Sequence, residues 1–158
     1  AHDDVRSQFA EAYRSVRTAL QFSTRDGAPR VFMVTSTGQA DGKTTTAIAL
    51  AINSAQTGRP VLLIDADMRH ASVHKALGVD NSRGLSNFLS SDVPALGVVR
   101  TTEIANLFVI PAGPMPPNPV ELLSGPKLAS LLGQLGDRAR PESAVPNALP
   151  FHEPRRVL

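Results

Sequence analysis

The sequence lacks several residue types, and each absence narrows what the chain can be. Its 158 residues include no cysteine, no tryptophan and a single tyrosine. Without cysteine, disulfide bonds and thiolate metal sites are excluded. An excess of positive charge is also absent, because the formal net charge is only +2. Arg155 and Arg156 form the only pair of adjacent arginine or lysine residues. We therefore expect no nucleic-acid-binding stripe and no nucleic-acid partner.

Long apolar runs are missing as well. No stretch approaches the ~18 apolar residues of a membrane-spanning helix, and the N-terminus has no secretion signal. We therefore expect this chain itself to be soluble. It begins with Ala1 rather than methionine, so it can be a piece of a longer polypeptide with a membrane-spanning part upstream. The length leaves room for one domain.

Alternating helix and strand patterns predict an α/β fold. An amphipathic helix is expected from Val5 to about Phe22, with an apolar stripe at helical spacing formed by Phe9, Tyr13, Val16 and Leu20. A strand over 30–36, a helix from Thr44 to about Gln56 and a strand over 61–64 then predict a right-handed parallel unit.

The middle of the chain continues this pattern. Short helices are expected over 72–77 and 85–89, and a short apolar strand over 107–110. Pro119 suits the first position of a helix, and a further helix carries the apolar stripe Leu128, Leu131, Leu132 and Leu135. The tail 138–158 has four prolines and no periodicity, so we expect it to be disordered.

The stretch between the strand at 30–36 and the next helix has the features of a phosphate-binding loop. It ends in Gly42, Lys43 and Thr44, whose backbone N–H groups, ammonium group and hydroxyl suit a polyphosphate and its Mg²⁺. The pattern is imperfect, because Thr37 replaces a glycine and Ala40 stands where a tight turn favours one. An alanine held at positive φ costs about 1–2 kcal/mol. The residues expected to contact nucleotide are Gln39, Ala40, Asp41, Gly42, Lys43, Thr44 and Thr45.

Two carboxylates follow the strand at 61–64. The carboxyl ends of parallel strands line one crevice, so Asp65 and Asp67 are expected to face the loop around Lys43. Such an aspartate can hold a Mg²⁺-bound water or accept a proton from an attacking hydroxyl. The alternative is that Asp65 only caps the following turn.

Five landmarks in order make the chain resemble a known family. They are EAYRSVR at 11–17, VTS with DGKTTTA within 34–47, VLLIDADMR at 61–69, GLSNFL at 84–89, and LFVIPAG with PNPVELL within 107–123. Together they resemble the cytoplasmic domain of bacterial tyrosine kinases of the capsule and exopolysaccharide type, a group of P-loop ATPases related to MinD and ParA.

The resemblance implies roles for individual residues. Lys43 and Thr44 would belong to the Walker A loop and Asp65 and Asp67 to the Walker A′ motif, so that Lys43, Asp65 and Asp67 are the expected catalytic residues and Thr44 and Asp65 the Mg²⁺ ligands. The implied cofactors are ATP and Mg²⁺. The base for a tyrosine hydroxyl would be Asp65.

The resemblance also implies partners and a location. Glu11, Arg14 and Arg17 match an E-x-x-R-x-x-R pattern that joins subunits in a ring, although a solvated helix face explains the same spacing. A membrane-bound polysaccharide co-polymerase, separate or fused upstream, would be the activating partner. The chain would then act in the cytoplasm at the inner face of the bacterial plasma membrane.

The chain departs from the family near Arg138. The family continues with the Walker B strand, which ends in aspartate, whereas here arginine, proline and alanine take over, as a shifted reading frame in GC-rich DNA would produce. We therefore expect a partial P-loop domain at 1–137, with an oligomerisation helix and linker at 1–29. Its parallel sheet would be incomplete, with unpaired edges or a gap near Val31 and Leu107.

Activity is therefore expected to be impaired. The Walker B aspartate is missing, and Tyr13 is the only tyrosine although the family phosphorylates a C-terminal tyrosine cluster. Two other functions stay open. One is a partitioning ATPase of the MinD or ParA type, which would carry an extra lysine where Thr37, Gly38 and Gln39 stand. The other is a non-catalytic remnant whose N-terminal helix docks on intact homologues.

Overall fold

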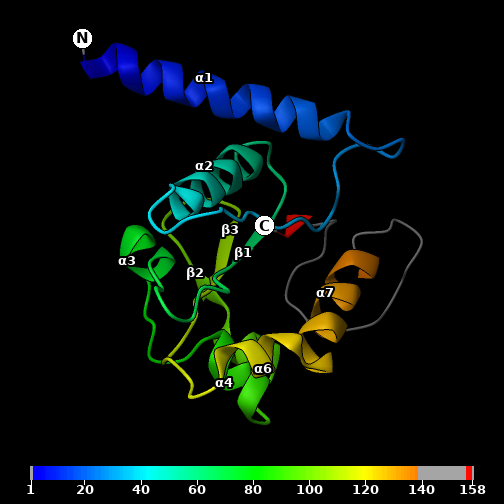
Figure 1. Cartoon of the computed structure of the whole chain (residues 1–158). Coiled ribbons are helices and arrows are strands. Elements are labelled where there is room, and N and C mark those ends of the chain that lie inside the picture. Colours follow the sequence, from blue (N-terminus) through cyan, green and yellow to red (C-terminus); the bar gives the residue numbers. More distant parts are fainter. Residues whose placement is uncertain (1, 139–155, 158) are drawn as a thin grey trace.

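The computed structural model describes residues 2–138 and 156–157. Helices and strands follow one another in the order α1 (His2–Gln21), α2 (Lys43–Ala55), β1 (Val61–Ile64), α3 (Val73–Leu77), α4 (Leu85–Ser90), α5 (Ala95–Val98), β2 (Arg100–Thr101), β3 (Leu107–Ile110), α6 (Pro119–Ser124), α7 (Pro126–Arg138) and β4 (Arg156–Val157). Figure 1 shows α1 lying across α2, with the strands below α2. No described helix is long and apolar enough to cross a membrane.

Four strands in the order β2-β3-β1-β4 form the sheet. The parallel strands β1 and β3 pair along their whole length, from Val61 opposite Leu107 to Ile64 opposite Ile110. Both are short apolar runs, which suits strands covered on both faces. Asn106, the residue before β3, has φ of 64°, a conformation that asparagine tolerates, and its C=O accepts the Val61 N–H at 2.8 Å. The short β2 is antiparallel to β3, so the sheet is mixed.

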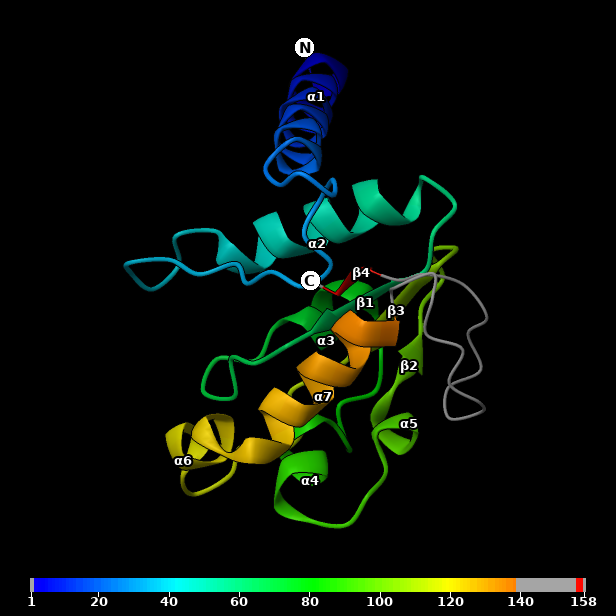
Figure 2. The same ribbon diagram turned by 90° about the vertical axis from the view of Figure 1, so that its right-hand side faces the viewer.

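The strands divide their side chains between two apolar clusters, as a period of two requires. Val61 and Leu63 pack with α2 on one face, whereas Leu62 packs with α4 and α7 on the other. Figure 2 shows the same arrangement, with α2 on one side of the strands and α4, α6 and α7 on the other. The molecule is therefore a three-layer α/β domain in which α2 is itself covered by α1.

The expected strand over 30–36 is wrong. Residues 32–36 form no strand, and β1 pairs with β3 and β4. Val34 and Thr35 favour an extended backbone, but a strand also needs a neighbour with which to exchange hydrogen bonds. Here a cavity separates this segment from β1. The expected strand-helix-strand unit therefore lacks its first strand.

The expectations for the chain end have a mixed outcome. Arg156–Val157 forms β4, parallel to β1, so the expectation of a tail without strands is wrong for these two residues. The rest of the expected disordered tail, 139–155 and 158, lies outside the described residues. The expected free edge at Leu107 is also wrong, because β3 has β1 on one side and β2 on the other.

Other elements agree closely with the expectations. The strands at 61–64 and 107–110 are confirmed, the helices α2, α3 and α4 begin within a residue of their expected starts, and α6 begins at Pro119. The short α5 and β2 were not expected. In α1 the expected stripe is only partly correct, because Tyr13 and Leu20 are half-buried whereas the side chains of Phe9 and Val16 are 62% and 45% exposed.

Candidate nucleotide site

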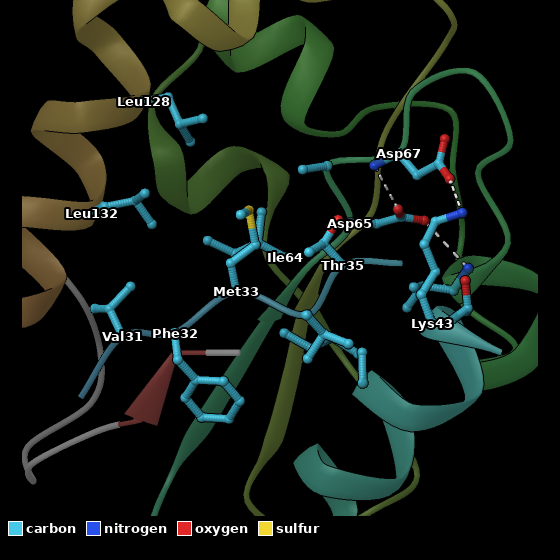
Figure 3. A pocket seen from close by; sticks show the side chains of 16 residues that line it. Val31, Phe32, Met33, Thr35, Lys43, Ile64, Asp65, Asp67, Leu128 and Leu132 are labelled. Carbon is cyan, nitrogen blue, oxygen red and sulfur yellow. Dashed lines mark hydrogen bonds and ion pairs between the residues drawn. The ribbon is translucent and has the colours of Figure 1, made fainter. Parts of the chain in front are cut away.

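The C-terminal end of β1 and the N-terminal end of α2 meet at one edge of the sheet. Between them opens a cavity of about 640 Å³. Four of the expected site residues, Lys43, Thr44, Asp65 and Asp67, line it (Figure 3). The other expected nucleotide contacts do not line this cavity; they are Gln39, Ala40, Asp41, Gly42 and Thr45. All belong to the loop before α2 or to its first turn.

The loop before α2 makes the tight turn that its sequence suggested. Ala40 has φ of 64° and Gly42 has φ of 82°. The Asp41 carboxylate accepts the Gly38 N–H at 2.7 Å, and the Ser36 hydroxyl donates to the Gly38 C=O at 2.8 Å. Ala40 therefore occupies the left-handed region, where a Cβ is unfavourable.

The N-terminus of α2 has the properties of an anion site. The helix has 13 residues, no acidic side chain in its first turn and no side-chain cap on its first N–H groups. These donors and the positive end of the helix dipole are thus open to an anion. Lys43 at the first helical position adds a positive charge.

Lys43 is paired within the protein. Its Nζ lies 2.8 Å from Asp67 Oδ2. This hydrogen bond, together with the charges of Asp67, Asp65 and Asp41, raises the pKa of Lys43 despite partial desolvation. Burial acts to raise the pKa of Asp67, but the bonds from Lys43 and from the His70 N–H outweigh it, so the pKa of Asp67 is lowered. At neutral pH the two groups form an ion pair.

Asp65 differs from its neighbour because it is buried, with 5% of its surface exposed. Its Oδ1 accepts the Asp67 N–H at 3.1 Å and its Oδ2 accepts the Val73 N–H at 3.3 Å. Burial raises the pKa of Asp65, and the backbone donors, which include the Ser72 N–H, only partly offset this. The carboxyl thus caps the turn before α3 and also lines the cavity.

Ser72 belongs to the site although no sequence pattern marked it. Its Oγ lies 3.0 Å from Thr44 Oγ1, and the next residue donates to Asp65. Ser72 follows Asp65 by seven residues in an irregular loop, so only the folded structure brings it to Thr44.

The oxygens at the site fit Mg²⁺ when phosphate supplies the remaining ligands. Thr44 offers a hydroxyl and Asp65 a carboxylate at the same cavity. Mg²⁺ is usually held by one or two carboxylates together with phosphate oxygens and waters. Among the described residues there is no cluster of three or more histidine, cysteine, aspartate or glutamate side chains that could hold a metal alone.

The structure does not hold Glu11, Arg14 and Arg17 as one group. Glu11 and Arg14 form an exposed ion pair at 3.6 Å. Arg17 is half-buried and its Nη1 donates to the Asn53 C=O of α2 at 3.3 Å. Arg17 therefore fastens α1 to the domain.

Comparison with known proteins shows which family this chain is related to. The model of the AAA domain family matches residues 31–116. The tyrosine-protein kinase YwqD of Bacillus subtilis is 40% identical over 124 residues, which cover 78% of this chain and 52% of YwqD. The chain thus spans about half the length of this curated relative.

Solved structures give the same result for the fold. The kinase domain of the Escherichia coli tyrosine kinase ETK has a TM-score of 0.77 and 34% identity, with 82% of this chain and 51% of that chain covered. The septum site-determining protein MinD of Pyrococcus horikoshii, solved with Mg-ADP, has a TM-score of 0.58 and 27% identity, with 67% and 44% covered. The fold is therefore that of a P-loop ATPase domain.

Proposed function

Because this chain belongs to the AAA domain family, as a P-loop domain of the bacterial tyrosine kinase type, we propose that it binds ATP with Mg²⁺ at the loop around Lys43. We further propose that it serves the synthesis or export of an extracellular polysaccharide. Its resemblance to capsule and exopolysaccharide kinases supports this role.

The observation that carries the proposal is the meeting of Lys43, Thr44 and Asp65 around one cavity beside an uncapped helix N-terminus. Lys43 would leave Asp67 and neutralise phosphate oxygens, while backbone N–H groups of α2 hold the remaining charge. Thr44 and Asp65 would hold Mg²⁺, which supplies charge neutralisation on the phosphates. Ser72 would keep the Thr44 hydroxyl in place.

For phosphoryl transfer, Asp65 is the best-placed proton acceptor. Its raised pKa favours uptake of a proton from an attacking hydroxyl. We expect the phosphoryl transfer to be slow. Among the described residues, no third carboxylate joins Asp65 and Asp67 to form a metal site. Loss of one preorganised electrostatic group costs on the order of 10²–10³ in rate.

A phosphotransfer assay tests the catalytic part of this proposal. The chain is incubated with Mg-ATP and a tyrosine-containing polymer, and phosphotyrosine is measured for the wild type, Asp65→Asn and Asp26→Asn. We expect weak labelling that Asp65→Asn abolishes and that Asp26→Asn, at an exposed position before the loop, leaves intact. Labelling that survives Asp65→Asn would contradict the role of Asp65, and strong labelling of Tyr13 would contradict the expected impairment.

The structural likeness to MinD favours a second candidate, a partitioning-type ATPase. This function requires hydrolysis of ATP without labelling of tyrosine. The same samples decide between the candidates, because release of phosphate without phosphotyrosine supports the ATPase.

We propose that α1 mediates assembly with copies of this chain or with intact homologues. Support comes from its exposed side, where Phe9, Glu11, Arg14 and Val16 face solvent. Gel filtration of the wild type and Arg14→Ala tests this proposal, and unchanged association would sink it. A membrane-bound polysaccharide co-polymerase remains our proposed partner at the inner face of the plasma membrane.

A further inference from the structure

A second cavity, of about 420 Å³, opens between α4, α6 and the segment that leads from β3 to α6. Figures 1 and 2 show α6 beside α4, on the face of the sheet away from α2. The described residues that line this cavity differ from those that line the nucleotide cavity. They come from three places, namely Ser86, Asn87 and Ser90 on α4, residues 114–118 of the connecting segment, and Glu121 and Leu122 on α6.

The walls of this second cavity are held by hydrogen bonds that leave its space open. The Ser86 N–H donates to the Ala112 C=O at 2.9 Å, which ties α4 to the connecting segment. Asn81 holds both backbone groups of Gly113, because its Oδ1 accepts the N–H at 2.8 Å and its Nδ2 donates to the C=O at 3.3 Å. A ligand would therefore meet a site that is already formed, which lowers the cost of binding.

The polar groups at the rim of the second cavity offer acceptors. Residues 114, 116 and 117 are prolines, which have a C=O but no N–H. The Ser90 hydroxyl donates to the Ser86 C=O at 2.7 Å, so its lone pairs remain for a ligand. Glu121 accepts a bond from Asn118 Nδ2 at Oε2, at 3.2 Å, and its Oε1 accepts none from the described residues. The rim thus suits a ligand rich in donors.

Ser86 adds a buried hydroxyl without a partner. The residue is 4% exposed, and its Oγ forms no hydrogen bond with the described residues. Buried hydroxyls in native proteins are nearly always paired, with protein, water or ligand, because an unpaired one loses its hydration without compensation. Since Ser86 lines the second cavity, a donor bound there can supply the missing partner.

The charge and the walls of the cavity narrow the ligand further. Among the described lining residues Glu121 is the only charged one, so the site favours a cation. The walls are largely apolar, with three prolines, Leu122 and Met115, whose side chain is 68% exposed. A guanidinium group combines a positive charge, five donors and a flat, weakly hydrated face, whereas an ammonium group is strongly hydrated and has no such face.

From these observations we propose that the second cavity binds the guanidinium group of an arginine side chain in a polypeptide. The carboxylate of Glu121 would accept two parallel N–H bonds, as carboxylates commonly do from arginine. The hydroxyl of Ser90 would accept a further bond, and the flat face would lie against the proline wall. Free arginine suits the site less well, because its own carboxylate would be repelled by Glu121.

An NMR titration of the full chain tests the proposal. The probe is the capped peptide Gly-Ser-Arg-Ser-Gly, and the control peptide carries citrulline in place of arginine, which keeps the shape and removes the charge. We expect the arginine peptide to shift the amide signals of Ser86, Ser90 and Glu121 in a saturable manner. The citrulline peptide should bind at least about tenfold more weakly, because the charge-assisted bonds are lost.

Paired variants locate the binding. Glu121→Gln removes the charge from the cavity, and Glu103→Gln removes the same charge from an exposed position outside it. We expect Glu121→Gln to weaken binding of the arginine peptide at least about tenfold and Glu103→Gln to leave it unchanged. Ser90→Ala, at an exposed position that the fold tolerates, should weaken it about threefold through the loss of one acceptor.

The remaining outcomes are equally sharp. Lys43→Ala should bind the arginine peptide like the wild type, so failure of the nucleotide proposal leaves this test intact. Equal binding of the two peptides, or equal binding by Glu121→Gln and the wild type, would overturn the proposal. Free arginine that bound more tightly than the peptide would overturn the assignment to a polypeptide side chain.

Discussion

Among single residues, Ala40 combines an unusual backbone with a place in the nucleotide loop. Its φ of 64° lies in the left-handed region, which costs an alanine about 1–2 kcal/mol and a glycine almost nothing. The strain belongs to the loop that would surround the phosphates. Strained residues of this kind persist where the surrounding structure fixes them.

We expect Ala40→Gly to raise the free energy of unfolding by about 1 kcal/mol, because the glycine relieves this strain. The matched control is Ala105→Gly, at an exposed turn position that has negative φ. This control should lower the stability slightly through the entropy of the unfolded chain. Urea unfolding of the three proteins measures the difference, and a loss of stability in Ala40→Gly would show that the loop is not strained.

The Lys43–Asp67 pair gives the nucleotide-free protein a pH-dependent stability. The pKa of Asp67 is lowered on folding and the pKa of Lys43 is raised. The contribution of the pair is therefore complete between the unfolded pKa values of about 3.9 and 10.4. It is lost as the pH falls through the lowered pKa of Asp67 or rises through the raised pKa of Lys43.

Asp67→Asn removes this contribution. We expect the variant to melt at a lower temperature than the wild type at pH 7, and the difference to shrink as the pH falls below 4. Thermal unfolding in EDTA across this range measures the effect. A difference that stays constant down to pH 2 would mean that Asp67 acts through its shape and not through its charge.

At the scale of elements, the contact between α4 and the segment after β3 leaves no room for a side chain at Gly84. A Cβ on Gly84 would lie 2.2 Å from the Pro111 C=O and 2.3 Å from the Gly113 N. Because Gly84 has no Cβ, the two backbones come close enough for the N–H groups of Leu85 and Ser86 to donate to the C=O groups of Pro111 and Ala112. The glycine is needed for space, since its φ of −160° suits any residue.

We expect Gly84→Ala to destabilise the protein by about 3 kcal/mol, because backbone atoms would have to move. Gly133→Ala on α7 is the opposite case, since its Cβ would meet nothing within 4 Å. It should stabilise the helix by about 1 kcal/mol. Chemical denaturation measures both, and equal effects of the two substitutions would contradict the close approach at Gly84.

Some elements could be predicted from the sequence and others could not, for physical reasons. The apolar strands β1 and β3 and the proline-led start of α6 depend on local residue pattern, which the sequence contains. The strand over 30–36 failed because its pairing depends on a neighbour far away in the chain. The contact of Ser72 with Thr44 and the bond from Arg17 to α2 join different elements of the fold. The spacing of residues along one element does not reveal such contacts.

For the whole molecule, the cavity between β1 and the segment before the loop links the fold to the proposed nucleotide site. Among the described residues β4 is the last strand on this side of the sheet, and the segment before the loop does not pair with β1. The cavity beside them is lined by Lys43, Thr44, Asp65 and Asp67 at one end and by apolar side chains at the other. The residues of the loop and of the DAD stretch predicted that Asp65 and Asp67 lie near Lys43, and the resemblance to kinases predicted an incomplete sheet, whereas the position of β4 required the structure.

Calorimetric titration of the whole chain with Mg-ATP tests the central claim most directly. The comparison is between the wild type, Lys43→Ala and Lys75→Ala, the last of which removes an exposed lysine on α3. We predict that the wild type and Lys75→Ala bind Mg-ATP with the same affinity and that Lys43→Ala binds at least about tenfold more weakly, because a charge-assisted contact to phosphate is lost. Equal binding by all three proteins, or no binding by the wild type, would contradict the assignment of this domain as a nucleotide-binding P-loop domain.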